Sequence, residues 1–168
     1  MGFNNVALLG AGTMGQGIAW ALAAAGKEVI LFDIYPEYCD KAIKSIGAIK
    51  KGLTKAEEKG KAAPGTADAV VGRIKGTTNF DDLAAGDLVI EVVPEVMSLK
   101  KEIYTKLDAL MGPDVILATN TSSLSITEIA AITKRSDKVI GVHFFNPANV
   151  MRLIEVIPLW LTEYSCPA

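Results

Sequence analysis

The chain has 168 residues, of which 50% are hydrophobic and 21% are charged, a balance typical of one soluble globular domain. Its 17 basic and 19 acidic residues give a net charge of −2, which argues against nucleic acid or a membrane surface as the main partner. Cys39 and Cys166 lie far apart, without metal-ligand spacing. We therefore expect free thiols, no metal site and, because no cationic leader precedes the first apolar run, a cytoplasmic location.

The chain begins with a pattern typical of a strand–helix–strand unit. Residues 6–9 form a short apolar run, residues 14–25 have a helical pattern that ends at Gly26, and residues 28–32 form a second apolar run. A crossover of this length joins parallel strands.

A glycine-rich turn, Gly10-Ala-Gly12-Thr-Met-Gly15, leads into the first helix. Gly10 permits the tight turn, Gly12 allows a pyrophosphate to approach the backbone, and Gly15 allows close packing of helix on strand. The free N–H groups at the start of the helix attract phosphates. We expect Gly10, Gly12, Thr13, Met14 and Gly15 to bind a dinucleotide. An ordinary glycine-rich turn is the alternative, which the flanking strands disfavour.

The residue at the end of the second apolar run, Asp33, indicates which dinucleotide binds. A carboxylate at this position accepts hydrogen bonds from the adenosine ribose and repels a 2′-phosphate. No arginine follows closely; the next residues are Ile34, Tyr35 and Pro36. The predicted cofactor is therefore NAD rather than NADP, with a helix-capping role for Asp33 as the alternative.

The rest of the chain continues the alternation of helices and strands. Helices are expected at 36–61 and 66–74, as a hairpin inserted after the second strand, then at 98–111 and after a capping box at Ser125. Strands are expected at 76–78, 87–91, 115–118, 138–144 and 151–157. This order predicts an α/β fold with a Rossmann-like, doubly wound, mostly parallel sheet over residues 1–157. Residues 158–168 fit no element, and we expect an atypical tail there, from truncation, a frameshift or a cloning remnant.

The only histidine, His143, lies at the carboxyl end of an expected strand, where parallel sheets bind ligands. A packed core residue is the alternative. If the chain returns after His143, Glu155 on the next extended segment comes to lie beside the imidazole. A carboxylate on one ring nitrogen fixes the tautomer, so that the other nitrogen is free to take a proton. The polar Asn146 follows just beyond the strand.

A polar segment, Thr119-Asn-Thr-Ser-Ser-Leu124, follows the expected strand at 115–118 and so lies at the same edge of the sheet. Its hydroxyl and amide groups are suited to hold a substrate oxygen or the nicotinamide amide. Turn and capping chemistry is the alternative. We favour functional roles for Ser122 and Asn120.

Four segments, in this order and spacing, resemble the 3-hydroxyacyl-CoA dehydrogenase family, and in particular bacterial members that act on short acyl chains such as 3-hydroxybutyryl-CoA. They are Gly10-Ala-Gly-Thr-Met-Gly-Gln-Gly-Ile-Ala19, Ser98-Leu-Lys-Lys-Glu102, Thr119-Asn-Thr-Ser-Ser-Leu124 and His143-Phe-Phe-Asn-Pro147. The resemblance covers about residues 6–157. It implies NAD-dependent oxidation of the 3-hydroxyl of an acyl-CoA thioester to a 3-ketoacyl-CoA, and the reverse reduction.

The resemblance also implies roles for individual residues. His143 is the base, and Glu155 pairs with it. Ser122 and Asn146 contact the substrate. The nicotinamide side of the cofactor site is implied to consist of Glu95, Lys100 and Asn120.

The helical insertion is rich in lysine, and the resemblance implies that it helps to bind the anionic coenzyme A. Lys50, Lys51 and Lys55 are the candidates, although a solvated helix face is the alternative. Family members continue into a helical domain that supplies much of a homodimer interface and closes over the substrate. We expect this chain to lack such a segment, and therefore to bind NAD better than it turns over substrate.

Three other functions remain open. A gulonate-type dehydrogenase, or lens lambda-crystallin, resembles the same family closely. A hydroxyacid dehydrogenase with a lysine base is disfavoured by the His143-Phe-Phe-Asn-Pro147 segment. A non-catalytic dinucleotide-binding module is the third. Comparing free hydroxyacids with acyl-CoA thioesters as substrates separates the first two from the predicted activity.

Overall fold

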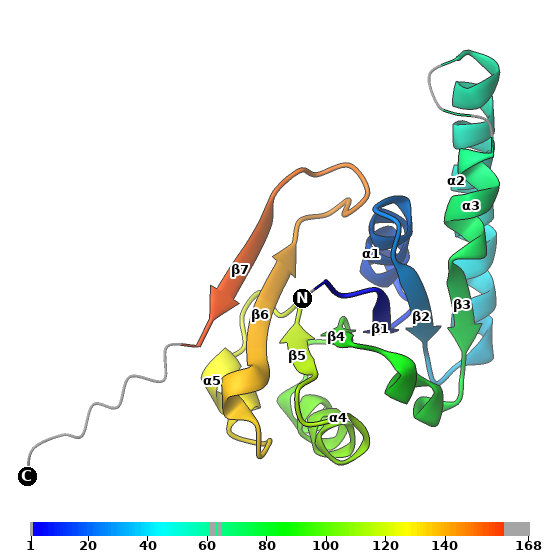
Figure 1. Ribbon diagram of the computed structural model, residues 1–168. Helices are drawn as coiled ribbons and strands as arrows, with labels where there is room; N and C mark the ends of the chain where they lie inside the picture. The colour runs from blue at the N-terminus through cyan, green and yellow to red at the C-terminus, as the bar shows by residue number, and fades with distance from the viewer. Residues whose placement is uncertain (1, 61–62, 64, 160–168) are drawn as a thin grey trace, which may run out of the picture.

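The computed structural model describes residues 2–60, 63 and 65–159. Its centre is one seven-stranded sheet with the strand order β3-β2-β1-β4-β5-β6-β7 (Figure 1). The strands are β1 Asn5–Leu9, β2 Glu28–Phe32, β3 Ile74–Thr77, β4 Leu88–Glu91, β5 Ile116–Thr119, β6 Val139–Phe144 and β7 Ile154–Pro158. All neighbours pair in parallel except β6 and β7, which are antiparallel. The strand order reverses between β1 and β4, which is where such sheets bind dinucleotides.

Helices cover both faces of the sheet, as a doubly wound fold requires. They are α1 Thr13–Ala24, α2 Pro36–Glu58, α3 Thr66–Gly72, α4 Met97–Leu110 and α5 Ile126–Ala130, with short 3₁₀ turns η1 Phe80–Ala85 and η2 Ser136–Lys138. Helices α2 and α3 pack as a hairpin beside β3 and extend away from the sheet (Figure 1). The predicted α/β fold and the hairpin insertion after the second strand are thus confirmed. Among the described helices, none combines the length and apolar character needed to span a membrane.

The alternation of side chains along β1 divides the core into two layers. Val6 and Leu8 pack on one face, with Ile18 and Ala19 of α1, whereas Ala7 and Leu9 pack on the other, with residues of α4 and α5. This period of two lets a strand that is apolar throughout be buried on both sides. The sheet is therefore a rigid base for the loops at its carboxyl edge.

The observed elements differ from the expected ones in several places, including α2, which ends at Glu58 rather than at residue 61, and β3, which spans Ile74–Thr77 rather than 76–78. Helix α3 ends at Gly72 rather than at residue 74, because Ile74 already pairs with Val29 of the neighbouring strand. The turn η1, which was not predicted, begins where the Asn79 side chain accepts a hydrogen bond from the N–H of Asp81. Strand β7 begins at residue 154 rather than 151 and includes Pro158, one residue into the expected tail, opposite Ile140. Residues 160–168 of that tail lie outside the described part of the chain.

Candidate cofactor and active site

The glycine turn between β1 and α1 has the geometry of a dinucleotide site. Gly10 has a φ of +106°, in the left-handed region that favours glycine, and a Cβ there would press against the carbonyl of Val92. A Cβ on Gly15 would collide with the carbonyl oxygen of Gly10. At Gly12, by contrast, a Cβ would meet no heavy atom within 4 Å. Gly10 therefore permits the turn, Gly15 permits close packing of the helix, and Gly12 leaves space in which a ligand could approach the backbone.

Helix α1 begins at this turn, with Gly12 as its N-cap and no side chain capping it. The first backbone N–H groups of the helix therefore remain directed at the open space next to Gly12. Thr13, the first residue of the helix, is exposed, and Met14 is half-buried against the core. An open approach and free donors at the start of a helix fit a pyrophosphate.

Asp33 joins the glycine turn to the end of β2. One of its carboxylate oxygens accepts a hydrogen bond from the N–H of Ala11 at 2.9 Å, and the other from the N–H of Tyr35 at 3.2 Å. The alternative role as a helix cap does not hold, because the N-cap of α2 is Tyr35 and no side chain caps that helix. Asp33 is therefore held beside the pyrophosphate turn, at the position where a carboxylate binds an adenosine ribose.

The predicted pair of His143 and Glu155 is formed. The two residues lie opposite each other in the register of β6 and β7, and Nδ1 of His143 is 2.9 Å from Oε2 of Glu155. The imidazole side chain is 22% exposed and the carboxylate 51% exposed, so the alternative of a sealed core histidine is wrong. The ring of Phe145 lies against the imidazole, with 4.8 Å between ring centroids. With Nδ1 bonded to Glu155, Nε2 is the nitrogen left to exchange a proton with a ligand.

Glu95 connects the loop after β4 to the loop after β5. Its carboxylate accepts hydrogen bonds from the Thr121 hydroxyl at 2.7 Å and from the Ser122 N–H at 2.9 Å, and the Ser122 hydroxyl is 3.5 Å away. Burial raises the pKa of Glu95, but these donors and the ammonium of Lys100 outweigh it and hold the pKa below its ordinary value. The carboxylate is therefore ionised at neutral pH, and it fixes the backbone of the candidate substrate residue Ser122.

A buried ion pair lies beneath this loop. Nζ of Lys100 is 2.7 and 2.8 Å from the two carboxylate oxygens of Glu91, and the side chains are 1% and 0% exposed. The Thr119 hydroxyl and the Val93 N–H complete the hydrogen bonds of that carboxylate. Lys100 also lies 3.9 Å from Glu95. The ammonium of Lys100 is thus paired with Glu91 below the surface. Binding of the cofactor by Lys100 stays a prediction.

Sequence reasoning missed two residues of this network. Glu91 was treated only as the last residue of a strand, although a carboxylate that ends an apolar run at the ligand-binding edge was a usable signal. Thr121 was included in the polar segment but given no role. It is buried, and its hydroxyl oxygen also accepts from the N–H of Leu124 at 3.0 Å, so it organises the whole turn.

The two asparagines lie near the carboxyl end of β6, the strand that carries His143. The side-chain oxygen of Asn120 accepts a hydrogen bond from the N–H of Phe144 at 2.8 Å, which ties the loop after β5 to the end of β6. Asn146 is exposed just beyond that strand end. The structure thus brings Asn120 next to the His143 strand, while the direct roles of both asparagines stay predictions.

The candidate coenzyme A lysines all belong to α2. Lys50 makes an ion pair with Asp68 across the α2–α3 hairpin, and Lys55 is exposed. The side chain of Lys51 lies outside the described residues. The ion pair of Lys50 favours a structural role for that residue, and binding of coenzyme A by the hairpin stays a prediction.

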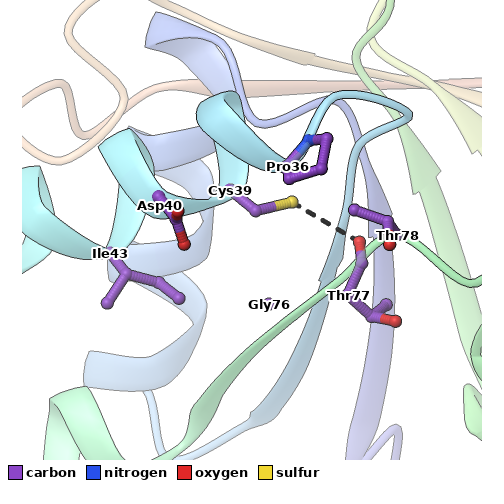
Figure 2. Close-up of a pocket in the computed structure, with 7 residues that line it drawn as sticks. All are labelled: Pro36, Cys39, Asp40, Ile43, Gly76, Thr77 and Thr78. Carbon is purple, nitrogen blue, oxygen red and sulfur yellow. Dashed lines mark hydrogen bonds between the residues drawn. The ribbon is translucent and has the colours of Figure 1, made fainter.

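A hollow of about 310 Å³ lies between the start of α2 and the end of β3 (Figure 2). Cys39 lines it, and its thiol donates to the Thr77 carbonyl at 3.4 Å. Burial raises the pKa of Cys39, which disfavours the reactive thiolate. The hollow lies at β3, which four strands separate from β6, the strand that carries His143, so it belongs to neither the glycine turn nor the His143–Glu155 pair.

Comparison with known proteins identifies the family of this chain. Residues 5–166 match the family described as 3-hydroxyacyl-CoA dehydrogenase, NAD binding domain. A 3-hydroxybutyryl-CoA dehydrogenase of Clostridioides difficile is 47% identical over 94% of this chain and 55% of its own length. The chain spans about half the length of the curated relatives it matches.

Solved structures give the same result. The crystal structure of 3-hydroxybutyryl-CoA dehydrogenase from Escherichia coli K12 matches with a TM-score of 0.86 and 42% identity, over 93% of this chain and 32% of that one. The (S)-3-hydroxybutyryl-CoA dehydrogenase from Ralstonia eutropha matches with a TM-score of 0.84 and 42% identity, over 92% and 54%. With its glycine turn, Asp33 and the His143–Glu155 pair in place, the chain belongs to the 3-hydroxyacyl-CoA dehydrogenase family, as an NAD-binding domain.

Proposed function

We propose that the chain supplies the cofactor site and the proton-transfer pair for NAD-dependent oxidation of the 3-hydroxyl of a short-chain 3-hydroxyacyl-CoA, and for the reverse reduction. The observation that carries the proposal is the contact of His143 with Glu155 at 2.9 Å, at the same sheet edge as the glycine turn. The names of the relatives, which are 3-hydroxybutyryl-CoA dehydrogenases, support this substrate class.

The proton is handled by His143. Glu155 accepts a hydrogen bond from Nδ1–H, so the neutral ring carries its lone pair on Nε2, where it takes the proton of the substrate 3-hydroxyl. Bound NAD⁺ supplies the acceptor for the hydride that leaves C3 of the substrate. In the reverse direction the imidazolium protonates the forming alkoxide, and Glu155 stabilises its charge. Proton transfer of this kind contributes roughly 10²–10⁴ in rate.

Ser122 and Asn146 are the groups that would orient the reacting oxygen and the thioester carbonyl. Ser122 is exposed, and its backbone N–H is fixed by Glu95 at 2.9 Å, which limits the positions of its hydroxyl. A hydroxyl held in this way costs little further ordering when substrate binds. Homodimerisation through a further domain and location in the cytoplasm remain predictions from the sequence.

The test is the oxidation of NADH by acetoacetyl-CoA, followed by NADH absorbance, for the wild-type chain, His143→Gln and Glu155→Gln. We expect His143→Gln to lower the rate at least 100-fold, and Glu155→Gln to lower it as well, because the carboxylate no longer fixes the tautomer that leaves the lone pair on Nε2. Asp114 lies before β5, at the amino ends of the strands and thus away from the proposed site. Asp114→Asn is therefore the matched control and should leave the rate unchanged. NADH binding is measured on the same samples by fluorescence.

Two outcomes contradict the proposal. Undiminished turnover by His143→Gln removes the histidine from the reaction. Faster turnover of free hydroxyacids than of acyl-CoA thioesters indicates a gulonate-type dehydrogenase instead.

A further inference from the structure

The strand order sets the direction in which a dinucleotide lies across the sheet edge. Asp33 ends β2, the glycine turn follows β1, Glu95 follows β4, Ser122 follows β5 and His143 is on β6. With the adenosine ribose at Asp33 and the pyrophosphate at the glycine turn, the nicotinamide half extends over the ends of β4 and β5, toward the histidine. This inference rests on the proposed function, and it places Glu95 beside the ring that changes charge during the reaction.

The charges at this position do not cancel. The network holds two carboxylates, Glu91 and Glu95, and one ammonium, Lys100. Lys100 is 2.7 Å from Glu91 but 3.9 Å from Glu95, so its charge is mostly compensated by the buried partner. Glu95 is 37% exposed, whereas the pair beneath it is sealed. The one excess negative charge of the network is therefore the carboxylate that faces the sheet edge.

The position of that carboxylate is fixed rather than averaged over many rotamers. Thr121 and Ser122 hold its two oxygens from the neighbouring loop, at 2.7 and 2.9 Å. Glu155, a further carboxylate of the site, lies on β7, three strands away from β4, and is paired with His143. A charged group whose position is fixed before the ligand binds interacts with the ligand without a free-energy cost of reorganisation.

We propose that the Glu95 carboxylate makes the site discriminate between the two redox states of the cofactor, by favouring NAD⁺, with its cationic nicotinamide ring, over NADH, with its neutral ring. Hydrogen bonds to the ribose and the pyrophosphate are the same in both states. Only the charge on the ring differs, so a fixed negative charge near it changes the ratio of the two dissociation constants. For a unit charge several ångströms away, at a partly solvated position, the expected effect on that ratio is about fivefold.

The test measures Kd for NAD⁺ and for NADH by titration calorimetry. We expect Glu95→Gln to raise the ratio Kd(NAD⁺)/Kd(NADH) about fivefold relative to the wild type. The side chain of Asp114 is 96% exposed and lies before β5, at the other edge of the sheet. Asp114→Asn removes the same charge from there and should leave the ratio unchanged.

A second pair of variants leaves Glu95 and its hydrogen bonds intact. Val96 is exposed and follows Glu95 in the same loop. Val96→Lys adds a positive charge there and should raise the ratio Kd(NAD⁺)/Kd(NADH). Val96→Met adds an unbranched side chain of similar length to lysine but without the charge, and it should leave the ratio unchanged. This pair decides the question even if Glu95→Gln disturbs the loop or loses both cofactors.

The outcomes separate the two proposals. If the wild-type chain binds both cofactors and the ratio is the same in Glu95→Gln and Val96→Lys, the discrimination by Glu95 is overturned and the proposed function stands. If the wild-type chain binds neither NAD⁺ nor NADH, the proposed function fails, and the inference fails with it.

Discussion

Glu91 and Lys100 form an ion pair that is sealed from solvent, with both carboxylate oxygens within 2.8 Å of the ammonium. The pair joins the end of β4 to the first turns of α4, directly below the loop that carries Glu95. Buried ion pairs are costly to form, and apolar replacements are often as stable. Its presence here is best explained by the loop that it supports, because Lys100 also reaches toward Glu95.

Breaking this pair from one side should destabilise the protein strongly. Lys100→Met leaves the Glu91 carboxylate buried without its counter-ion, which should lower the free energy of unfolding by about 3–5 kcal/mol. The double variant Glu91→Gln, Lys100→Met removes both charges and should recover a large part of that loss. Urea unfolding followed by circular dichroism measures both. Equal losses in the single and double variants would contradict a dominant charge effect.

The Asp33 carboxylate should determine which dinucleotide binds. Asp33→Ser removes the group that accepts from the ribose and repels a 2′-phosphate. We expect NADH affinity to fall about tenfold, which corresponds to roughly 1.4 kcal/mol, and the preference for NADH over NADPH to shrink. Fluorescence titration with both cofactors gives the two affinities. A preference that stays as strong as in the wild type would show that another residue excludes NADPH.

Two glycines of the same turn should respond differently to alanine. A Cβ at Gly12 meets no atom within 4 Å, so Gly12→Ala should lower the free energy of unfolding by less than about 1 kcal/mol but weaken NADH binding at least tenfold. A Cβ at Gly15 collides with the Gly10 carbonyl, so Gly15→Ala should lower stability and binding together. Thermal unfolding and NADH titration on both variants check this. Normal NADH affinity in Gly12→Ala would place the pyrophosphate elsewhere.

The free energy of unfolding should fall at acidic pH, in part because the Asp108 carboxylate becomes protonated. Burial raises the pKa of Asp108, but the N–H of Lys134 and the guanidinium of Arg135 outweigh this and lower it. A folded pKa below the unfolded value means that the stabilisation is complete above the unfolded pKa and is lost as pH falls through the folded one. The difference in unfolding free energy between the wild type and Asp108→Asn should therefore be larger at about pH 7 than below about pH 4. A difference independent of pH would assign the effect to packing.

Much of the site was predictable because its signals are local in sequence. The glycine turn and Asp33 belong to one strand–helix–strand unit, and a chain return after His143 is enough to bring Glu155 beside it. The pairing of Glu91 with Lys100 was not predictable in the same way. Nothing in the helical pattern of 98–111 shows that one lysine points inward, because burial of an ammonium depends on a carboxylate supplied by a neighbouring element.

The boundary between α3 and β3 shows a similar limit. The helical pattern continues through Ile74, but the hydrogen bonds offered by β2 draw that residue into the sheet. Local propensity is a weak preference that tertiary pairing overrides. Lys50 of the hairpin shows it too, since its ion pair with Asp68 of α3 depends on a neighbouring element and not on the local lysine pattern.

The carboxylate of the His143–Glu155 pair lies on β7, one of the two edge strands of the described sheet. All five residues of β7 are exposed, and the strand is hydrogen-bonded to β6 alone. An edge strand such as β7 can unfold locally at a free energy well below that of global unfolding. The contact between Glu155 and His143 is then lost while the glycine turn and the central strands stay folded. Mild denaturant should therefore abolish the proposed proton transfer before it releases the dinucleotide, and stabilising β7 should narrow the gap between the two transitions.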